Sequence, residues 1–167
     1  MKILLLSDTH SYMDDAIINH CKQVDEVWHA GDFGNREVAD KIKSVKSLQG
    51  VFGNIDGKDI RIEYPLDNRF TINDLDVWIT HIGGYPGRYE ARVRKVLDIH
   101  TPQLFICGHS HILKVMFDKN YNMLTMNPGA AGKYGFHKVR TMIRFEIHNG
   151  KIEKPEVIEL GLRAALK

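Results

Sequence analysis

The sequence contains few cysteines and no long hydrophobic segment. Cys21 and Cys107 are its only two cysteines, and no Cys-x-x-Cys spacing is present, so neither a disulfide nor a thiolate metal site is predicted. Apolar runs such as Ile3–Leu6 are far too short to span a bilayer. Met1 leads directly into a predicted strand without a cleavable signal pattern, so we expect a cytoplasmic protein with reduced cysteines and no membrane partner.

The sequence also lacks a strong excess of charge. Its net charge is +2, and no basic block is longer than two residues, so no dedicated nucleic-acid binding is expected. We find no internal repeat, low-complexity tract or linker. A length of 167 residues fits one domain, which we place at residues 1–167.

Short apolar strands alternate with amphipathic helices in the first half of the chain. Strands are predicted at residues 2–7, 26–30 and 47–52, separated by helices near 13–23 and 36–45. Asn35 is the expected N-cap of the second helix. This alternation predicts parallel strands joined by right-handed crossovers.

The second half is richer in strands. We predict strands at 61–64, 69–73, 75–80 and 103–107, a helix near 89–99, and hairpin strands at 113–118 with 122–127 and at 139–147 with 151–159. Asn149-Gly150 is the strongest hairpin-turn signal. The expected fold class is α/β, with two packed mixed β-sheets and helices outside.

Side chains that can bind a metal follow five of the predicted strands. They are Asp8, His10, Asp32, Asn54, His81, His109 and His111. Because the carboxyl ends of strands border the crevice of an open α/β sheet, these side chains are expected to converge. Gly31, Gly53 and Gly108 beside them are expected to permit sharp turns. The nitrogen and oxygen donors favour Mn, Fe, Zn, Co or Ni.

The number of donors indicates two metal ions. A single catalytic site uses about three protein ligands, fewer than this chain offers. Two divalent ions would outweigh the charges of Asp8 and Asp32, and the remaining positive field suits a phosphate ester. Two ions about 3.5–4 Å apart can share a hydroxide nucleophile and stabilise charge on phosphate oxygens.

In these motifs the sequence resembles the calcineurin-like metallophosphoesterases, in particular their small bacterial and archaeal phosphodiesterases. The shared motifs are Asp-x-His at 8–10, Gly-Asp at 31–32, Gly-Asn at 53–54, His81, and Gly-His-x-His at 108–111. The resemblance extends from Asp8 to Asn127-Pro128-Gly129.

The resemblance implies a four-layer α/β sandwich and a binuclear centre, with manganese as the first expectation. It implies that one ion is held by Asp8, His10, Asp32 and His111. A second ion would be held by Asp32, Asn54, His81 and His109, with Asp32 bridging. Asp8, Asp32, Asn54 and His81 are the expected catalytic residues, and the expected reaction is hydrolysis of a phosphodiester by a hydroxide that bridges the metals.

Three departures from the family pattern stand out. Ile55 occupies the position where many members have a histidine that assists the leaving group, which predicts slow turnover of poor leaving groups. His81-Ile82-Gly83 replaces the more usual His-Gly-His. Ala130 follows Asn127-Pro128-Gly129 where serine is common.

Several other polar residues have a structural and a functional interpretation. Asp56 is expected to accept hydrogen bonds within its own loop rather than to bind metal. His29 is expected to be a buried hydrogen-bonding residue, and His137 to lie in a loop where substrate contact stays open. We expect His20, His100 and His148 at the surface. The glycine-rich segment 83–88 lacks the Gly-Lys-Ser/Thr of a P-loop.

Alternative functions also follow from the sequence. The same ligands could serve a phosphomonoesterase or a nucleotide pyrophosphatase, and a retromer subunit that resembles this family is a non-catalytic scaffold with altered ligands. The expected partner is a small phosphate-ester substrate, whose identity stays open. The hairpin edges near 113–127 and 139–159 could also support a homo-oligomer.

Overall fold

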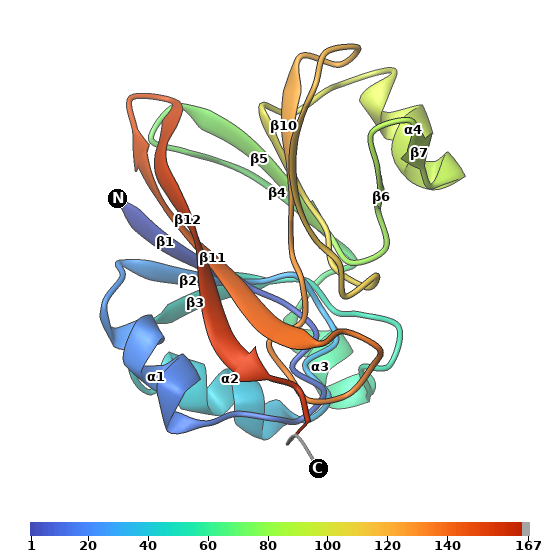
Figure 1. Ribbon diagram of the computed structural model, residues 1–167. Helices are drawn as coiled ribbons and strands as arrows, with labels where there is room; N and C mark the ends of the chain where they lie inside the picture. Colours follow the sequence, from blue (N-terminus) through green and yellow to red (C-terminus); the bar gives the residue numbers. More distant parts are fainter. Residues whose placement is uncertain (165–167) are drawn as a thin grey trace.

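Two five-stranded sheets form the framework of the structure, a computed structural model that describes residues 1–164 (Figure 1). The first sheet has the order β12-β11-β1-β2-β3. Its strands are β1 (Lys2–Leu6), β2 (Glu26–His29), β3 (Ser47–Gly50), β11 (Val139–His148) and β12 (Lys151–Leu162). Strands β1, β2 and β3 are parallel, whereas β11 runs antiparallel to both β1 and β12.

The second sheet has the order β4-β5-β8-β10-β9. Its strands are β4 (Asp67–Ile72), β5 (Leu75–Thr80), β8 (Leu104–Ile106), β9 (Leu113–Asp118) and β10 (Met123–Pro128). Strands β5, β8 and β10 are parallel, and the two edge strands are antiparallel to their neighbours. Both sheets are therefore mixed, as predicted.

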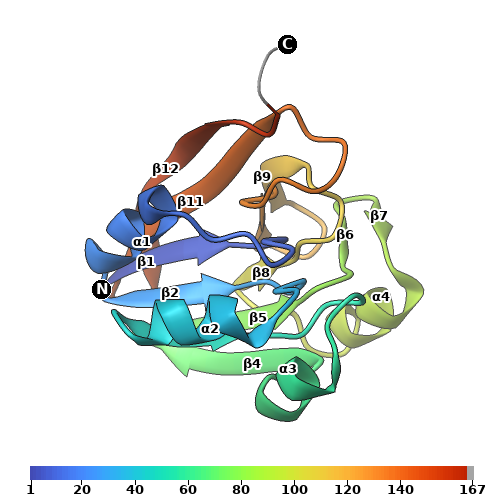
Figure 2. The same ribbon diagram turned by 90° about the horizontal axis from the view of Figure 1, so that it is seen from below.

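Helices cover the outer faces of the two sheets. Figure 2 shows α1 (Asp15–Lys22) and α2 (Arg36–Lys43) lying over the first sheet, with α4 (Ala91–Leu97) near the second. Strand β1 contributes to two cores because its side chains alternate: Leu4 and Leu6 pack with the helices, and Ile3 and Leu5 pack between the sheets. A third core lies between α4 and the second sheet. These three cores separate four layers, which confirms the predicted sandwich.

The predicted strand at 61–64 is wrong, because this segment belongs to helix α3 (Lys58–Glu63). Apolar residues at 60, 62 and 64 resemble the alternation of a strand. Only Ile60 and Tyr64, four residues apart, are buried, whereas Ile62 is 76% exposed. This spacing is helical, and tertiary packing decides between the two periods.

The remaining elements agree with the predictions apart from their ends. The glycine-rich segment after β5 contains a small hairpin of β6 (Gly84–Tyr85) and β7 (Arg88–Tyr89). Cys21 and Cys107 are free and buried, and burial raises the pKa of each thiol to about 12. Within residues 1–164, no helix has the length and apolar character needed to cross a membrane.

Candidate metal centre

The seven predicted ligands lie together at one end of the sandwich. They follow β1, β2, β3, β5 and β8 within five residues of the strand ends. These five strands belong to the parallel parts of the two sheets, so their carboxyl ends meet at the same crevice. The donors form two groups, of which one comprises Asp8, His10 and His111 and the other Asp32, His81 and His109.

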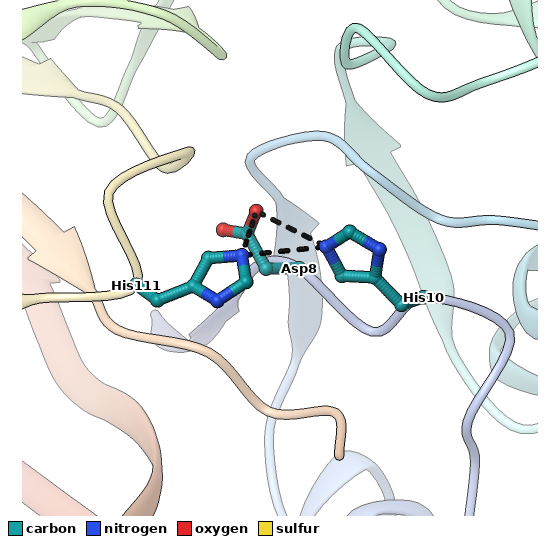
Figure 3. A group of neighbouring side chains, drawn as sticks. All are labelled: Asp8, His10 and His111. Atoms are coloured by element: carbon teal, nitrogen blue, oxygen red, sulfur yellow. Dashed lines mark hydrogen bonds and ion pairs between the residues drawn. The ribbon is translucent and has the colours of Figure 1, made fainter. Parts of the chain in front are cut away.

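The first group surrounds the buried carboxylate of Asp8 (Figure 3). Nε2 of His111 lies 3.1 Å from Oδ1 of Asp8, and Nε2 of His10 lies 3.8 Å from the same oxygen. The two imidazole Nε2 atoms are 3.3 Å apart. The figure shows both rings directing a nitrogen toward the carboxylate from opposite sides.

The second group is centred on Asp32 and His81, both almost completely buried. Oδ2 of Asp32 lies 3.2 Å from Nε2 of His81. Asn54 joins this group through its side-chain Oδ1, which lies 3.1 Å from Nε2 of His81 and 3.0 Å from Nδ1 of His109. Asn54 and His109 are exposed, so this group is open on one side.

Asp32 lies between the two groups. The same Oδ2 that approaches His81 is 3.6 Å from Nε2 of His10, a member of the first group. Its other oxygen, Oδ1, accepts a hydrogen bond from the backbone N–H of Ile55. Asp32 therefore directs one oxygen into the space that both groups share.

Five of the seven candidate ligands have a left-handed backbone. The φ angles are 55° at Asp8, 45° at His10, 58° at Asp32, 67° at His109 and 58° at His111. This conformation is unfavourable for residues with a Cβ. Backbone hydrogen bonds between loops hold it: the N–H of Asp8 donates to Gly31, that of His10 to Asp32, and that of Ser11 to Phe33.

Glycines beside the ligands serve two different purposes. Gly31 has φ of 99° and makes the expected sharp turn. Gly53 is absent from the residues with positive φ; instead, a Cβ there would lie 1.9 Å from Oδ1 of Asp32. A Cβ on Gly108 would likewise lie 2.1 Å from the hydroxyl of Ser7. The chain also turns at 53 and 108, where the N–H of Asp56 donates to the carbonyl of Gly53 and that of Ser110 to the carbonyl of Gly108, but there glycine makes room for neighbouring side chains.

The charges of the two groups depend on one another. Burial by itself would raise the pKa of Asp8, but the imidazoles of His10 and His111 beside its carboxylate hold it well below its usual range. Burial similarly opposes ionisation of Asp32, and the adjacent imidazole of His81 lowers its pKa. The pKa of His81 is raised because Asp32 and Asp8 outweigh the opposing effect of burial. Both carboxylates are thus ready to bind a cation at neutral pH.

The arrangement of donors fits a metal ion. Oδ1 of Asp8 is buried and makes no hydrogen bond among residues 1–164, although it faces imidazole nitrogens. Nδ1 of His81 is 2.7 Å from the carbonyl oxygen of Ala30, which fixes the proton on Nδ1 of the neutral ring and leaves the lone pair of Nε2 facing the centre. That lone pair meets oxygen lone pairs of Asp32 and Asn54. A cation at this point would satisfy all three.

Other residues support the ligands in ways that the sequence analysis missed. Ser7 donates to Oδ2 of Asp8 at 2.6 Å. The side-chain amide of Asn127 donates to the carbonyl of Gly108 and to the hydroxyl of Ser110, which anchors the loop of His109 and His111. The Asn-Pro-Gly motif at 127–129 is the signal that could have identified this role.

Asp56 and His29 lie behind the ligands. Asp56 accepts hydrogen bonds from the backbone N–H groups of Gly34 and Gly53, both at 2.8 Å. The bond from Gly53 is the predicted one within its own loop, whereas the bond from Gly34 reaches a second loop. His29 is buried; the N–H of Gly31 donates to its Nδ1, and its Nε2 lies 3.0 Å from Oγ1 of Thr9. Burial lowers the pKa of His29 to about 3. The neutral ring therefore joins the loops of Asp8 and Asp32.

A cavity of about 500 Å³ lies over the centre. Ile55 lines this cavity in place of the histidine of many family members, and so does His137. The ring centroids of His137 and His111 are 5.3 Å apart. The Nε2–H of His137 donates a hydrogen bond to the carbonyl oxygen of Gly132. His100 and His148 are exposed, and His20 is half-buried.

Comparisons with known proteins agree with this geometry. Residues 1–150 match the calcineurin-like phosphoesterase superfamily domain. The chain belongs to this family. A probable metallophosphoesterase of Methanocaldococcus jannaschii is 27% identical over 136 residues, which cover 78% of this chain and 68% of that protein.

Several solved structures have the same fold as this chain. One described as a novel archaeal phosphodiesterase has a TM-score of 0.71 at 23% identity and covers 96% of this chain and 100% of its own. Vps29 of Entamoeba histolytica in complex with Zn²⁺ has a TM-score of 0.73 at 16% identity, over 95% of this chain and 99% of its own. At these identities the likeness concerns the fold alone.

Proposed function

We propose that the protein is a binuclear-metal-dependent phosphodiesterase. The observation that carries this proposal is the pair of donor groups with Asp32 between them and an unpaired oxygen of Asp8 facing inward. One cation would be held by Asp8, His10 and His111. The other would be held by Asn54, His81 and His109, and Asp32 would bind both cations. The donors suit manganese first, with Fe, Zn, Co or Ni as alternatives.

The bound cations would lower the pKa of a water molecule and stabilise charge on phosphate oxygens. The protein's own contribution is to hold the donors in place. Hydrogen bonds from Ser7 and from the N–H of His109 fix Oδ2 of Asp8, so that only Oδ1 faces the centre. The carbonyl of Ala30 orients His81 in the same way. Such preorganisation reduces the rearrangement needed when charge develops.

Two cavities beside the centre favour a diester over a monoester. The cavity over the centre and a second one of about 370 Å³ both include Asn54 in their walls. A phosphate group held at the centre would therefore have a separate space on each side for an ester group. A monoester would leave one of these spaces without a ligand.

The leaving group receives no help from position 55. Ile55 is 46% exposed and presents a hydrocarbon side chain to the cavity. We therefore propose that the rate falls steeply as the leaving group becomes more basic. A series of aryl phosphodiesters with phenols of increasing pKa tests this, and a flat series contradicts it. Ile55→His should flatten the dependence if a histidine there can supply a proton.

Reconstitution of the metal-free protein tests the function itself. Chelated protein should be inactive on bis(p-nitrophenyl) phosphate, and added Mn²⁺ should restore turnover. Asp32→Ala and His109→Ala should each lower kcat/KM by more than about 100-fold, since removal of groups that only orient ligands already costs about 10–100-fold. His148→Ala, which changes an exposed histidine away from the centre, is the matched control.

The same assay separates the alternatives. Faster hydrolysis of p-nitrophenyl phosphate than of the diester would favour a phosphomonoesterase. A protein that binds metal but hydrolyses neither ester with any of the five metals would contradict the proposal and favour a scaffold. We also propose a small phosphate ester in the cytoplasm as the substrate, because the two free, buried cysteines suit a reducing compartment.

A further inference from the structure

The second cavity, next to Asn54 and His81, has a distinct chemical character. Its outer walls are formed by Phe52, Leu66 and Ile82 together with Arg61, Glu90 and Arg92. Its volume of about 370 Å³ is at the lower end of the range of small-molecule sites, about 300–1,000 Å³. Since Asn54 and His81 also belong to the metal centre, the cavity opens directly beside the position expected for phosphate.

The apolar part of this cavity remains accessible. Leu66 is 46% exposed and Ile82 is 36% exposed, although both are large hydrophobic residues. Phe52 is half-buried beside them. Apolar surface that stays open in a concave site next to a reaction centre gains free energy when a ligand covers it. These walls therefore favour an apolar group over a hydrated sugar or glycerol.

The two arginines are already engaged by protein groups. The guanidinium of Arg61 lies 4.3 Å above the ring of Phe52 and donates to the backbone carbonyls of Gly53, Asn54 and Asp56. Arg92 donates to both carboxylate oxygens of Asp67 and to the hydroxyl of Thr80. Neither guanidinium is left as a free phosphate clamp.

Glu90 removes the net positive charge that would favour an anionic ligand in the cavity. It precedes α4, and its side chain makes no capping hydrogen bond to that helix. Among the described residues 1–164, no salt bridge involves its carboxylate. With Arg92 neutralised by Asp67 at 2.7 Å, the negative charge of Glu90 offsets the positive charge of Arg61, so the cavity offers no net positive charge to a second phosphate or a carboxylate.

From these features we infer that the cavity of Phe52, Leu66 and Ile82 is a subsite for an uncharged aromatic ring on one ester group of the substrate. A flat ring, such as an aryl group or a nucleobase, can cover the three apolar side chains while the attached phosphate remains at the metal centre. This inference rests on the proposed function, because it assumes that the centre binds phosphate.

Binding of phosphonates tests the subsite without turnover. Phenylphosphonate and methylphosphonate share the anionic group and differ in the ring, and their P–C bond resists hydrolysis. Titration calorimetry in saturating Mn²⁺ should show phenylphosphonate binding about tenfold more tightly, as expected when a ring is removed from water. Because both phosphonates carry the same anionic group, a change at the phosphate site alters both dissociation constants alike and leaves their ratio unchanged.

Substitutions locate the ring. Leu66→Asp should reduce the ratio to about twofold or less, because it replaces an apolar wall by a charge. Ile99→Asp is the matched control, since Ile99 is 89% exposed and lines neither cavity, and it should preserve the ratio. Phe136→Ala tests the other cavity, whose wall includes this fully exposed ring.

Each outcome decides the inference. Loss of the ring preference in Leu66→Asp alone supports the subsite. A preference that survives Leu66→Asp and disappears in Phe136→Ala places the ring in the other cavity and overturns it, as does equal or absent binding of the two phosphonates by the unaltered protein. Ring-selective binding without hydrolysis of any ester would retain the subsite and refute the proposed function, so the two failures are distinguishable.

Discussion

Apart from Lys154 in β12, the left-handed residues other than glycine among residues 1–164 lie in two kinds of region, and different forces hold them there. In the hairpin turns they are residues such as Asn73, Asp74, Asn122 and Asn149. Asparagine and aspartate tolerate this conformation because their short side chains bond locally. At the metal centre the left-handed residues include aspartates, histidines and a serine, and the N–H groups of Asp8, His10 and Ser11 donate to carbonyl oxygens of another loop.

The difference shows where each conformation is encoded. The turn at Asn149-Gly150 follows from two adjacent residues and the strands beside them. The turn at His10 and Ser11 depends on carbonyl oxygens more than twenty residues away, at Asp32 and Phe33. Backbone strain of this kind persists when the surrounding structure determines it, and it is concentrated at functional sites.

Metal binding should produce the largest contrast between the two regions. Metal at about 100 times its dissociation constant stabilises a protein by about 2.7 kcal/mol, and we expect a rise of this order in the free energy of unfolding. Hydrogen exchange should slow at the amides of residues 8–11 and 109–111 and remain unchanged at 73–74 and 149–150. Equal slowing in both regions would show that metal binding does not act selectively on the loops of the centre.

Substitution of Asp56 should have the next largest effect. Asp56→Ala leaves the N–H groups of Gly34 and Gly53 without their partner, which costs about 1–3 kcal/mol for buried groups. We also expect kcat/KM to fall by about 10–100-fold, as for other groups that orient ligands. Denaturant unfolding and diesterase assays measure the two effects. Asp59→Ala, in the same segment but exposed, is the control.

Glycine and alanine substitutions measure the strain in each region. Without metal, His111→Gly should be more stable than His111→Ala by about 1 kcal/mol, because glycine adopts positive φ freely. The same difference is expected between Asn149→Gly and Asn149→Ala. Activity should be lost in both variants at 111 and kept in both at 149. Equal stability of the two variants at 111 would show that its backbone is not strained.

Asp14 makes both a local and a long-range bond, and its substitution should have the smallest effect on the free energy of unfolding. It caps α1 by accepting from the N–H of Ile17, and it forms an ion pair with buried Arg140 at 2.9 Å. Burial opposes its ionisation, but the bonds from Ile17 and Arg140 lower its pKa overall. The ionised group therefore adds stability above the unfolded pKa of about 3.9, and this contribution is lost as pH falls through the lower folded pKa.

Asp14→Asn keeps a good capping residue and removes the charge. We expect a loss of about 1 kcal/mol at pH 7, as for a typical intramolecular hydrogen bond, and no difference from the parent protein at the lowest pH. Thermal unfolding across the acid range measures this. A loss that is independent of pH would assign the effect to the cap rather than to the charge.

Much of the fold could be predicted because its signals are local. The alternation of strands and helices up to β3 follows from hydrophobic periodicity. The segment of α3 could not be assigned correctly, because Ile60, Ile62 and Tyr64 fit both periods and only packing buries Ile60 and Tyr64 together. The local pattern was ambiguous, and the tertiary structure resolved it.

At the centre, the identity of the donors could be predicted, but the way they are held could not. Asp8, Asp32 and His81 follow strand ends, so their convergence follows from topology. The tie from Asp56 to two separate loops leaves no pattern in the sequence, because its partners are backbone N–H groups. The cavity next to Asn54 and His81 could not be predicted either, since its lining residues Leu66 and Ile82 come together only in the folded chain.

The hydrogen bonds of Asp56 hold the turn of Asn54 independently of the chain that follows it. They fasten the turn that carries Asn54 before the chain continues into α3 and on to Leu66. Changes in the side chain at 66 can therefore alter the neighbouring cavity without displacing Asn54. Relatives with the same metal centre could thus acquire different substrates through a few substitutions downstream of this carboxylate.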